Sequence, residues 1–216
     1  MKTSDLSHSH RFHPITAWEA TLYALDWLVK AGKVRYIGCS KLAAWQIMKA
    51  LGISAREHLS KFVSLQAYYT IAGRDLEREV VPLLLDQKLG LMVWSPLAGG
   101  LLSGKYSSDT ETKEGRRVNF DFPPVNKEKA YDIVDVMRNI ADNKGVTVAQ
   151  IALSWLLHQP AVTSVIIGAN KSEQLADNLS SVDVKLEAEE LDQLNEVSKL
   201  SPEYPGWMIE RQGSGR

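Results

Sequence analysis

Short continuous apolar runs alternate along this chain with longer segments whose apolar residues recur every three or four positions. The short runs are typical of buried parallel strands, and the longer segments are typical of amphipathic helices. Strands are predicted at 34–40, 62–66, 91–95 and 162–167. Helices are predicted at 18–30, 43–51, 76–87, 127–143, 147–158, 172–179 and 188–200. This alternation predicts an α/β fold built on a parallel sheet.

Local signals place several of the helix boundaries. Gly52 is expected to end the second helix, and Pro82 indicates that the third helix starts late or kinks. Thr147 and Gln150 have the spacing of a capping box at the start of a helix. Residues 96–124 are rich in Gly, Ser, Pro and charge, which predicts a long functional or disordered loop.

Each clear strand finishes at a polar residue or a glycine. These residues are Ser40, Gln66, Ser95 and Gly168. In a (β/α) barrel the carboxyl ends of the strands carry the active site, and a complete barrel has eight strands in about 250 residues. This chain offers four clear strands, or five if the segment ending at His10 is one. We therefore expect residues 1–216 to form a single domain, an incomplete (β/α)8 TIM-type barrel with parallel strands and surrounding helices.

Composition excludes several classes of protein. The 216 residues carry a formal net charge of −1, so there is no basic excess for nucleic acid or a membrane surface. No stretch has the length of a signal peptide core or of a membrane span. The single cysteine, Cys39, lies in an apolar run, which predicts a buried inert thiol and fits a reducing cytoplasm. His8, His10 and His13 have no cysteine or carboxylate cluster beside them, so no metal site is expected.

Four segments resemble the aldo-keto reductase family, in the order and spacing of that family. They are residues 34–40, 65–69, 94–105 and 167–178. The resemblance covers nearly the whole chain. It implies an NADPH-dependent oxidoreductase that reduces aldehydes or ketones by hydride transfer, with a small carbonyl compound as substrate.

The residue types at these positions suit a nucleotide on physical grounds. Trp94 offers a flat face to a nicotinamide ring, and the glycine-rich run that ends at Lys105 suits a pyrophosphate, although such a run is more often only a turn. Ser172 opens a helix whose N–H groups suit an anion. Gln174 and Asn178 share one face of that helix, where they either contact adenosine or form a solvated surface.

The resemblance assigns these residues to parts of NADP(H). Ser40 and Gln66 would hold the carboxamide, and Trp94 would stack on the nicotinamide. The pyrophosphate would be wrapped by residues at the end of the third predicted strand and at the start of the long cofactor loop at 96–124, namely Ser95, Pro96, Leu97, Gly99, Leu101, Gly104 and Lys105. Arg117 would contact a phosphate, or else be a surface charge. The adenosine and its 2′-phosphate would be surrounded by Gly168, Asn170, Gln174, Asp177 and Asn178.

Two residues depart from the pattern of the family. Lys41 stands where many relatives have asparagine, which weakens one expected carboxamide contact. Asn170 stands where relatives often have a basic or hydroxyl residue, which leaves the choice between NADP and NAD open. Lys171 is a candidate for the missing charge.

The catalytic groups are mostly absent from this sequence. By resemblance a tyrosine donates the proton, a lysine and an aspartate lower its pKa, and a histidine orients the carbonyl. His10 matches that histidine if residues 1–16 hold the fourth strand of the barrel; the alternative is a flexible leader. The other three positions belong to earlier strands, and Tyr68, Tyr69 and Tyr106 do not match the proton donor.

Two functions remain open at this stage. One is a reductase impaired by truncation, and the other is a non-catalytic NADP(H)-binding pseudoenzyme or a subunit that needs a partner chain. An open sheet would expose strand edges, so a homo-oligomer that completes the barrel is expected. The tail at 203–208 is expected to cover the barrel or to line a pocket.

Overall fold

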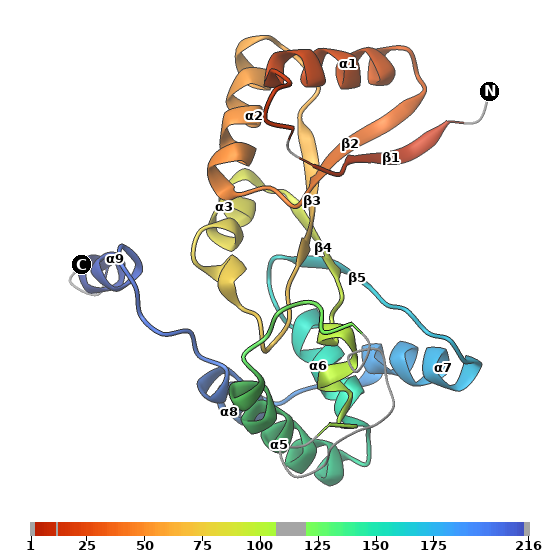
Figure 1. Cartoon of the computed structure of the whole chain (residues 1–216), viewed down its shortest axis with the longest axis vertical. Coiled ribbons are helices and arrows are strands. Elements are labelled where there is room, and N and C mark those ends of the chain that lie inside the picture. The colour runs from red at the N-terminus through yellow and green to blue at the C-terminus, as the bar shows by residue number, and fades with distance from the viewer. Residues whose placement is uncertain (1–2, 12, 107–119, 214–216) are drawn as a thin grey trace.

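The computed structural model describes residues 3–11, 13–106 and 120–213. Five parallel strands form one sheet whose spatial order follows the sequence (Figure 1). They are β1 (Ser4–Ser9), β2 (Val34–Ser40), β3 (Phe62–Tyr68), β4 (Gly90–Trp94) and β5 (Val162–Ile166). The α/β prediction is confirmed, and the segment before His10 is a strand. Sequential parallel strands joined through helices are the arrangement of a partial (β/α)8 barrel.

Helices occupy every connection between these strands. The α-helices are α1 (Trp18–Lys30), α2 (Ala44–Arg56), α3 (Val80–Gln87), α5 (Lys127–Lys144), α6 (Val148–Leu157), α7 (Ser172–Ser180), α8 (Ala188–Val197) and α9 (Gly206–Gly213). Three short 3-10 segments are η1 (Asp75–Glu77), η2 (Ala98–Ser103) and η3 (Ser181–Asp183). The predicted capping box is present, since Thr147 Oγ1 accepts from Gln150 N and Gln150 Oε1 accepts from Thr147 N.

Three boundaries differ from the prediction or refine it. Helix α2 continues through Gly52 to Arg56, because Ile53 is buried and its packing outweighs the roughly 1 kcal/mol cost of a helical glycine. Helix α3 starts late, so that Pro82 lies in the first turn, where no N–H is needed. Within the predicted loop at 96–124, residues 98–103 form η2, a 3-10 segment in which Gly99 and Gly100 have non-helical backbone angles.

The two faces of the sheet differ sharply in burial. Alternate side chains point to one face, which α1, α2 and α3 cover in Figure 1, and there Cys39, Leu65 and Leu91 are 0% exposed. The opposite face carries polar and aromatic side chains, and on it Tyr36 is 58% and Ile166 38% exposed. The first face is the hydrophobic core, and the second is open in part, includes the buried Ser40 and Ser64, and holds the candidate site.

The carboxyl-terminal tail lies away from the sheet. Helix α9 stands apart from the body in Figure 1, and Tyr204 and Trp207 are exposed. Arg78 holds the base of the tail through an ion pair of 3.0 Å to Glu203. The expectation that the tail covers the barrel or lines a pocket is therefore wrong for this structure.

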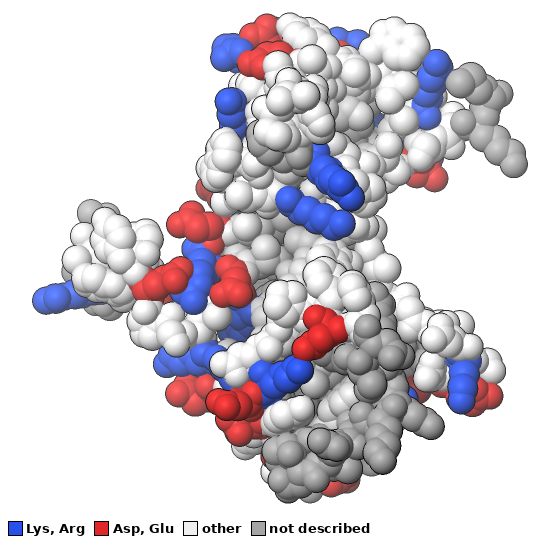
Figure 2. Space-filling view, viewed as in Figure 1, with Lys and Arg blue, Asp and Glu red and all other residues white. Residues whose placement is uncertain are grey.

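The surface carries both signs of charge. Figure 2 shows acidic and basic side chains interspersed over one face, with uncharged surface between them. In the part of the chain that the structure describes, no helix is long and apolar enough to span a membrane.

Candidate functional site

The ends of β2 and β3 place two predicted site residues side by side. Ser40 pairs with Gln66 in the sheet register, and the backbone N–H of Lys41 donates to the Gln66 carbonyl at 3.1 Å. Ser40 is completely buried. Its hydroxyl has no hydrogen-bond partner among the described residues. A buried hydroxyl without a partner is costly, so a ligand group that paired with it would be favoured.

Trp94 ends β4 and pairs in the sheet register with Tyr68, two residues beyond Gln66. Tyr68, the last residue of β3, packs against its ring with the centroids 5.2 Å apart. The indole Nε1 is buried and, within the described parts of the chain, has no hydrogen-bond partner. Phe122 stacks on the indole with the centroids 6.0 Å apart and the planes 10° apart, and Lys41 Nζ lies 6.0 Å from the same ring. A nicotinamide on Trp94 would therefore take the other ring face or replace Phe122.

These groups fit a nicotinamide. Its carboxamide has both an acceptor oxygen and a donor nitrogen, which suit the Ser40 hydroxyl and the Gln66 amide. Its ring is flat and suits the indole of Trp94. The fit rests on the two buried donors without partners, Ser40 Oγ and Trp94 Nε1.

The segment after β4 is tightly folded on itself. Ser95, Ala98, Gly99 and Gly100 all have positive φ, and Gly99 N donates to Ser95 Oγ at 3.2 Å. The N–H groups of residues 98, 100 and 102 also donate to carbonyls inside this segment. A pyrophosphate could use those four N–H groups only if the segment rearranged.

The residues predicted to hold the pyrophosphate differ in how exposed they are. Pro96 and Leu101 are buried, whereas Lys105 is exposed where an anion could reach it. Gly104 has a φ of 79°, and a Cβ there would lie 2.9 Å from Val148, so this glycine is required for packing. Arg117 lies outside the described residues.

The predicted adenosine residues fall into two groups. Gly168 and Asn170 are exposed, and the Asn170 N–H donates to Gln174 Oε1 at 3.2 Å. Asp177 already accepts from Thr147 Oγ1 at 3.2 and 3.1 Å, and Asn178 is buried. Asp177 therefore has a structural role in holding α7 to the start of α6.

His10 lies one residue beyond β1 and is exposed. His8, two residues earlier, is half-buried, and its Nε2 lies 3.1 Å from Ser64 Oγ on β3. Burial, followed by the charge of His10, lowers the pKa of His8 from its ordinary value. This pair could not be predicted from sequence, because its only signal is Gly38, the glycine that lies between the two side chains in the sheet.

Comparison with known proteins assigns this arrangement to a family. A sequence model described as the Aldo/keto reductase family matches residues 1–199. This chain belongs to the aldo-keto reductase family.

Several curated relatives are similar over most of this chain. Versiconal hemiacetal acetate reductase of Aspergillus parasiticus is 34% identical over 94% of the chain and 59% of its own length. A "Probable voltage-gated potassium channel subunit beta" of Arabidopsis thaliana is 33% identical over 93% of the chain and 63% of its own length. Aldo-keto reductase str7 of Strobilurus tenacellus is 33% identical over 97% of the chain and 62% of its own length. The chain spans less than two thirds of the length of these relatives.

The tyrosines of this aldo-keto reductase chain do not supply an evident proton donor. All seven tyrosines lie in the described parts of the chain. Tyr69 donates to Glu77 at 2.7 Å, and burial, reinforced by that hydrogen bond, raises its pKa. Tyr68 Oη lies 3.4 Å from Thr70 Oγ1. A tyrosine that donates a proton near neutral pH needs a lowered pKa, so Tyr69 has the opposite character.

The remaining reactive groups are inert in this structure. Cys39 is completely buried, and burial raises the pKa of its thiol to about 12. Within the described residues no cluster of three or more His, Cys, Asp or Glu side chains could hold a metal ion. The open face carries hydroxyl, amide, indole, imidazole and ammonium groups at its strand ends.

Proposed function

We propose that this chain binds NADP(H) at the carboxyl ends of β2, β3 and β4 and acts as an oxidoreductase on small aldehydes or ketones. The observation that carries the proposal is the pair of buried donors without partners, Ser40 Oγ and Trp94 Nε1. Family membership supports a nicotinamide cofactor, because aldo-keto reductases generally use one. When bound, the nicotinamide supplies the hydride.

The residues of the chain have distinct roles in this proposal. Ser40 and Gln66 hold the carboxamide, Trp94 packs on the ring, and Lys105 adds positive charge near the pyrophosphate. Asn170 and Lys171 are exposed at the start of α7, where they suit the 2′-phosphate. Contacts to this phosphate would make NADPH bind more tightly than NADH.

His10 is the residue proposed to orient the carbonyl group. Turnover is expected to be slow, since burial raises the pKa of Tyr69 and the family resemblance matches neither Tyr68 nor Tyr106 to the proton donor. We propose a cytoplasmic location, because a single cysteine gives the chain no internal disulfide.

Calorimetric titration tests the cofactor assignment. NADPH should bind saturably and more tightly than NADH, and Trp94→Leu should weaken binding by about tenfold through lost stacking. Trp27→Leu is the matched control, since Trp27 is an exposed tryptophan on α1, beside Lys33 and remote from the strand ends. Equal loss in both variants, or no binding to the wild type, would contradict the assignment. Loss of reduced-cofactor absorbance after an aldehyde is added measures turnover separately.

A second candidate is a cofactor-binding subunit without catalysis that pairs with another chain. It is favoured by the open face of the sheet, where Tyr36 and Ile166 are exposed, and by the two uncovered sheet edges at β1 and β5 among the described strands. Pairing of two copies would cover this face. Light scattering should then give a dimer, whereas a stable monomer would contradict it.

A further inference from the structure

Strand β1 is an edge strand, and it leads directly into His10. Among the described strands it pairs with β2 alone. Its ion pair from Asp5 to Arg35 joins side chains that are 82% and 68% exposed, so this pair contributes little. The place of His10 therefore depends on how firmly the carboxyl end of β1 is held.

A side-chain contact ties β1 to the strand beyond its neighbour. His8 lies opposite Gly38 in the register, and its ring passes over that glycine to reach Ser64 on β3. A Cβ at position 38 would lie 2.6 Å from both His8 Nε2 and Ser64 Oγ. Such a distance is impossible, so the contact requires glycine between the two side chains.

The contact lies on the same face as the candidate site. Side chains two apart on a strand point the same way, and the rings of His8 and His10 have centroids 6.3 Å apart. Ser64 is buried, which shields the contact from water, and its strand continues to Gln66. Fixing His8 therefore fixes the direction in which the chain reaches His10.

We infer that Ser64 and His8 form a clasp over Gly38 that positions His10 at the carbonyl site. His8 and Ser64 are positioning residues in this inference, and the functional meaning of His10 rests on the proposed function. The clasp itself can be tested without turnover.

Amide hydrogen exchange measured by NMR on the full chain tests the clasp. Ser64→Ala should speed exchange at residues 8–10 roughly fivefold, and it should shift the His10 Cε1 proton resonance. Ser64→Thr keeps the hydroxyl and should restore both values. The control is Ser54→Ala, which removes another buried hydroxyl, one that donates to the Ser60 carbonyl. Unchanged exchange and an unchanged His10 resonance in Ser64→Ala would overturn the inference.

The kinetic consequence provides a second readout. Ser64→Ala should lower kcat for aldehyde reduction several-fold while leaving the Kd of NADPH within twofold, because Ser64 acts on His10 and not on the cofactor. A change in the Kd of NADPH with kcat preserved would contradict positioning of His10. If the wild type fails to bind NADPH, the proposed function fails, while the exchange measurement still decides whether the clasp exists.

Discussion

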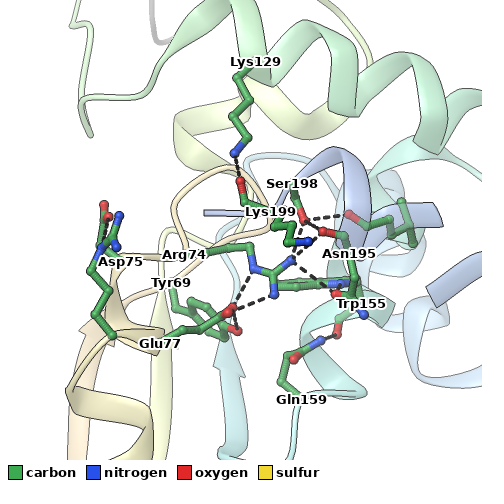
Figure 3. A network of polar contacts seen from close by, with 12 residues as sticks. Tyr69, Arg74, Asp75, Glu77, Lys129, Trp155, Gln159, Asn195, Ser198 and Lys199 are labelled. Atoms are coloured by element: carbon green, nitrogen blue, oxygen red, sulfur yellow. Dashed lines mark hydrogen bonds and ion pairs between the residues drawn. The ribbon is translucent and has the colours of Figure 1, made fainter. Parts of the chain in front are cut away.

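Two polar clusters in this chain differ in how their buried groups are paired. Around Arg74, between η1 and the helices α6 and α8, the polar groups satisfy one another (Figure 3). At the strand ends, Ser40 Oγ and Trp94 Nε1 are equally buried but have no partner among the described residues. Both clusters are polar and inside the molecule, so burial alone does not distinguish them.

The cluster around Arg74 is a closed network. The guanidinium donates to both carboxylate oxygens of Glu77 at 2.7 and 2.9 Å and to Ser198 Oγ at 2.7 Å. It also lies 5.2 Å from the ring of Trp155, whose Nε1 donates to Asn195 Oδ1 at 3.1 Å. Groups paired in this way stabilise the fold, whereas the unpaired donors at the strand ends suit the proposed cofactor.

Replacing Arg74 should give the largest effect on stability. Arg74→Met leaves Glu77 without its bidentate partner, and we expect a loss of about 3 kcal/mol in the free energy of unfolding by urea. Arg78→Met is the control, because Arg78 pairs with the exposed Asp75 and Glu203. It should cost less than about 1 kcal/mol. Equal losses of unfolding free energy in the two variants would mean that the Arg74 network stabilises the fold no more than an exposed ion pair does.

Two tryptophans provide the sharpest matched comparison. Trp155→Phe removes a paired N–H and part of a completely buried side chain, so it should cost about 2 kcal/mol of unfolding free energy. Trp94→Phe removes an unpaired N–H and should cost less than about 1 kcal/mol. A larger loss at Trp94 in urea unfolding would show that its indole N–H is satisfied in solution.

Replacing Asp177 tests whether its carboxylate stabilises the fold or binds the cofactor. Its carboxylate accepts from Thr147 Oγ1, so Asp177→Ala should lower the unfolding free energy by about 1 kcal/mol. The affinity for NADPH should change less than twofold if pairing is the main role. A tenfold loss of NADPH affinity in this variant, measured by calorimetry, would mean that Asp177 contacts the adenosine of the cofactor.

The pH dependence of His8 should give the smallest effect. Because its pKa is lowered in the fold, the unfolded chain binds more protons than the folded chain just below pH 6.5. The contribution of His8 to the free energy of unfolding is fully present above pH 6.5. It is lost as the pH falls toward the pKa of His8 in the folded chain. His8→Gln should remove this slope from urea unfolding curves. A slope that is unchanged in the variant would assign it to another group.

The features predicted from sequence were those set by local patterns. The apolar runs before Ser40 and Trp94 predicted strands, and Thr147 with Gln150 predicted the start of α6, because strand pattern and capping depend on near neighbours. The end of α2 was not predictable from Gly52, since burial of Ile53 depends on the tertiary structure.

Contacts between residues that are distant in the sequence, and the pairing of buried polar groups, could not be predicted from the sequence. Arg74 meets Asn195 across 121 positions, and Thr147 meets Asp177 across 30. Ser40 was predicted from its strand-end position and the family resemblance, but its lack of a partner could be seen only in the packed structure. The same holds for the ring of Phe122 on Trp94.

The most direct test of the unpaired-donor account is the stability of Ser40→Ala with and without NADPH. Without cofactor, the variant should be at least as stable as the wild type, because a buried hydroxyl without a partner is removed. At saturating NADPH, it should gain about 1.4 kcal/mol less than the wild type if its affinity falls tenfold. A variant that is less stable alone and gains as much from NADPH would contradict the account.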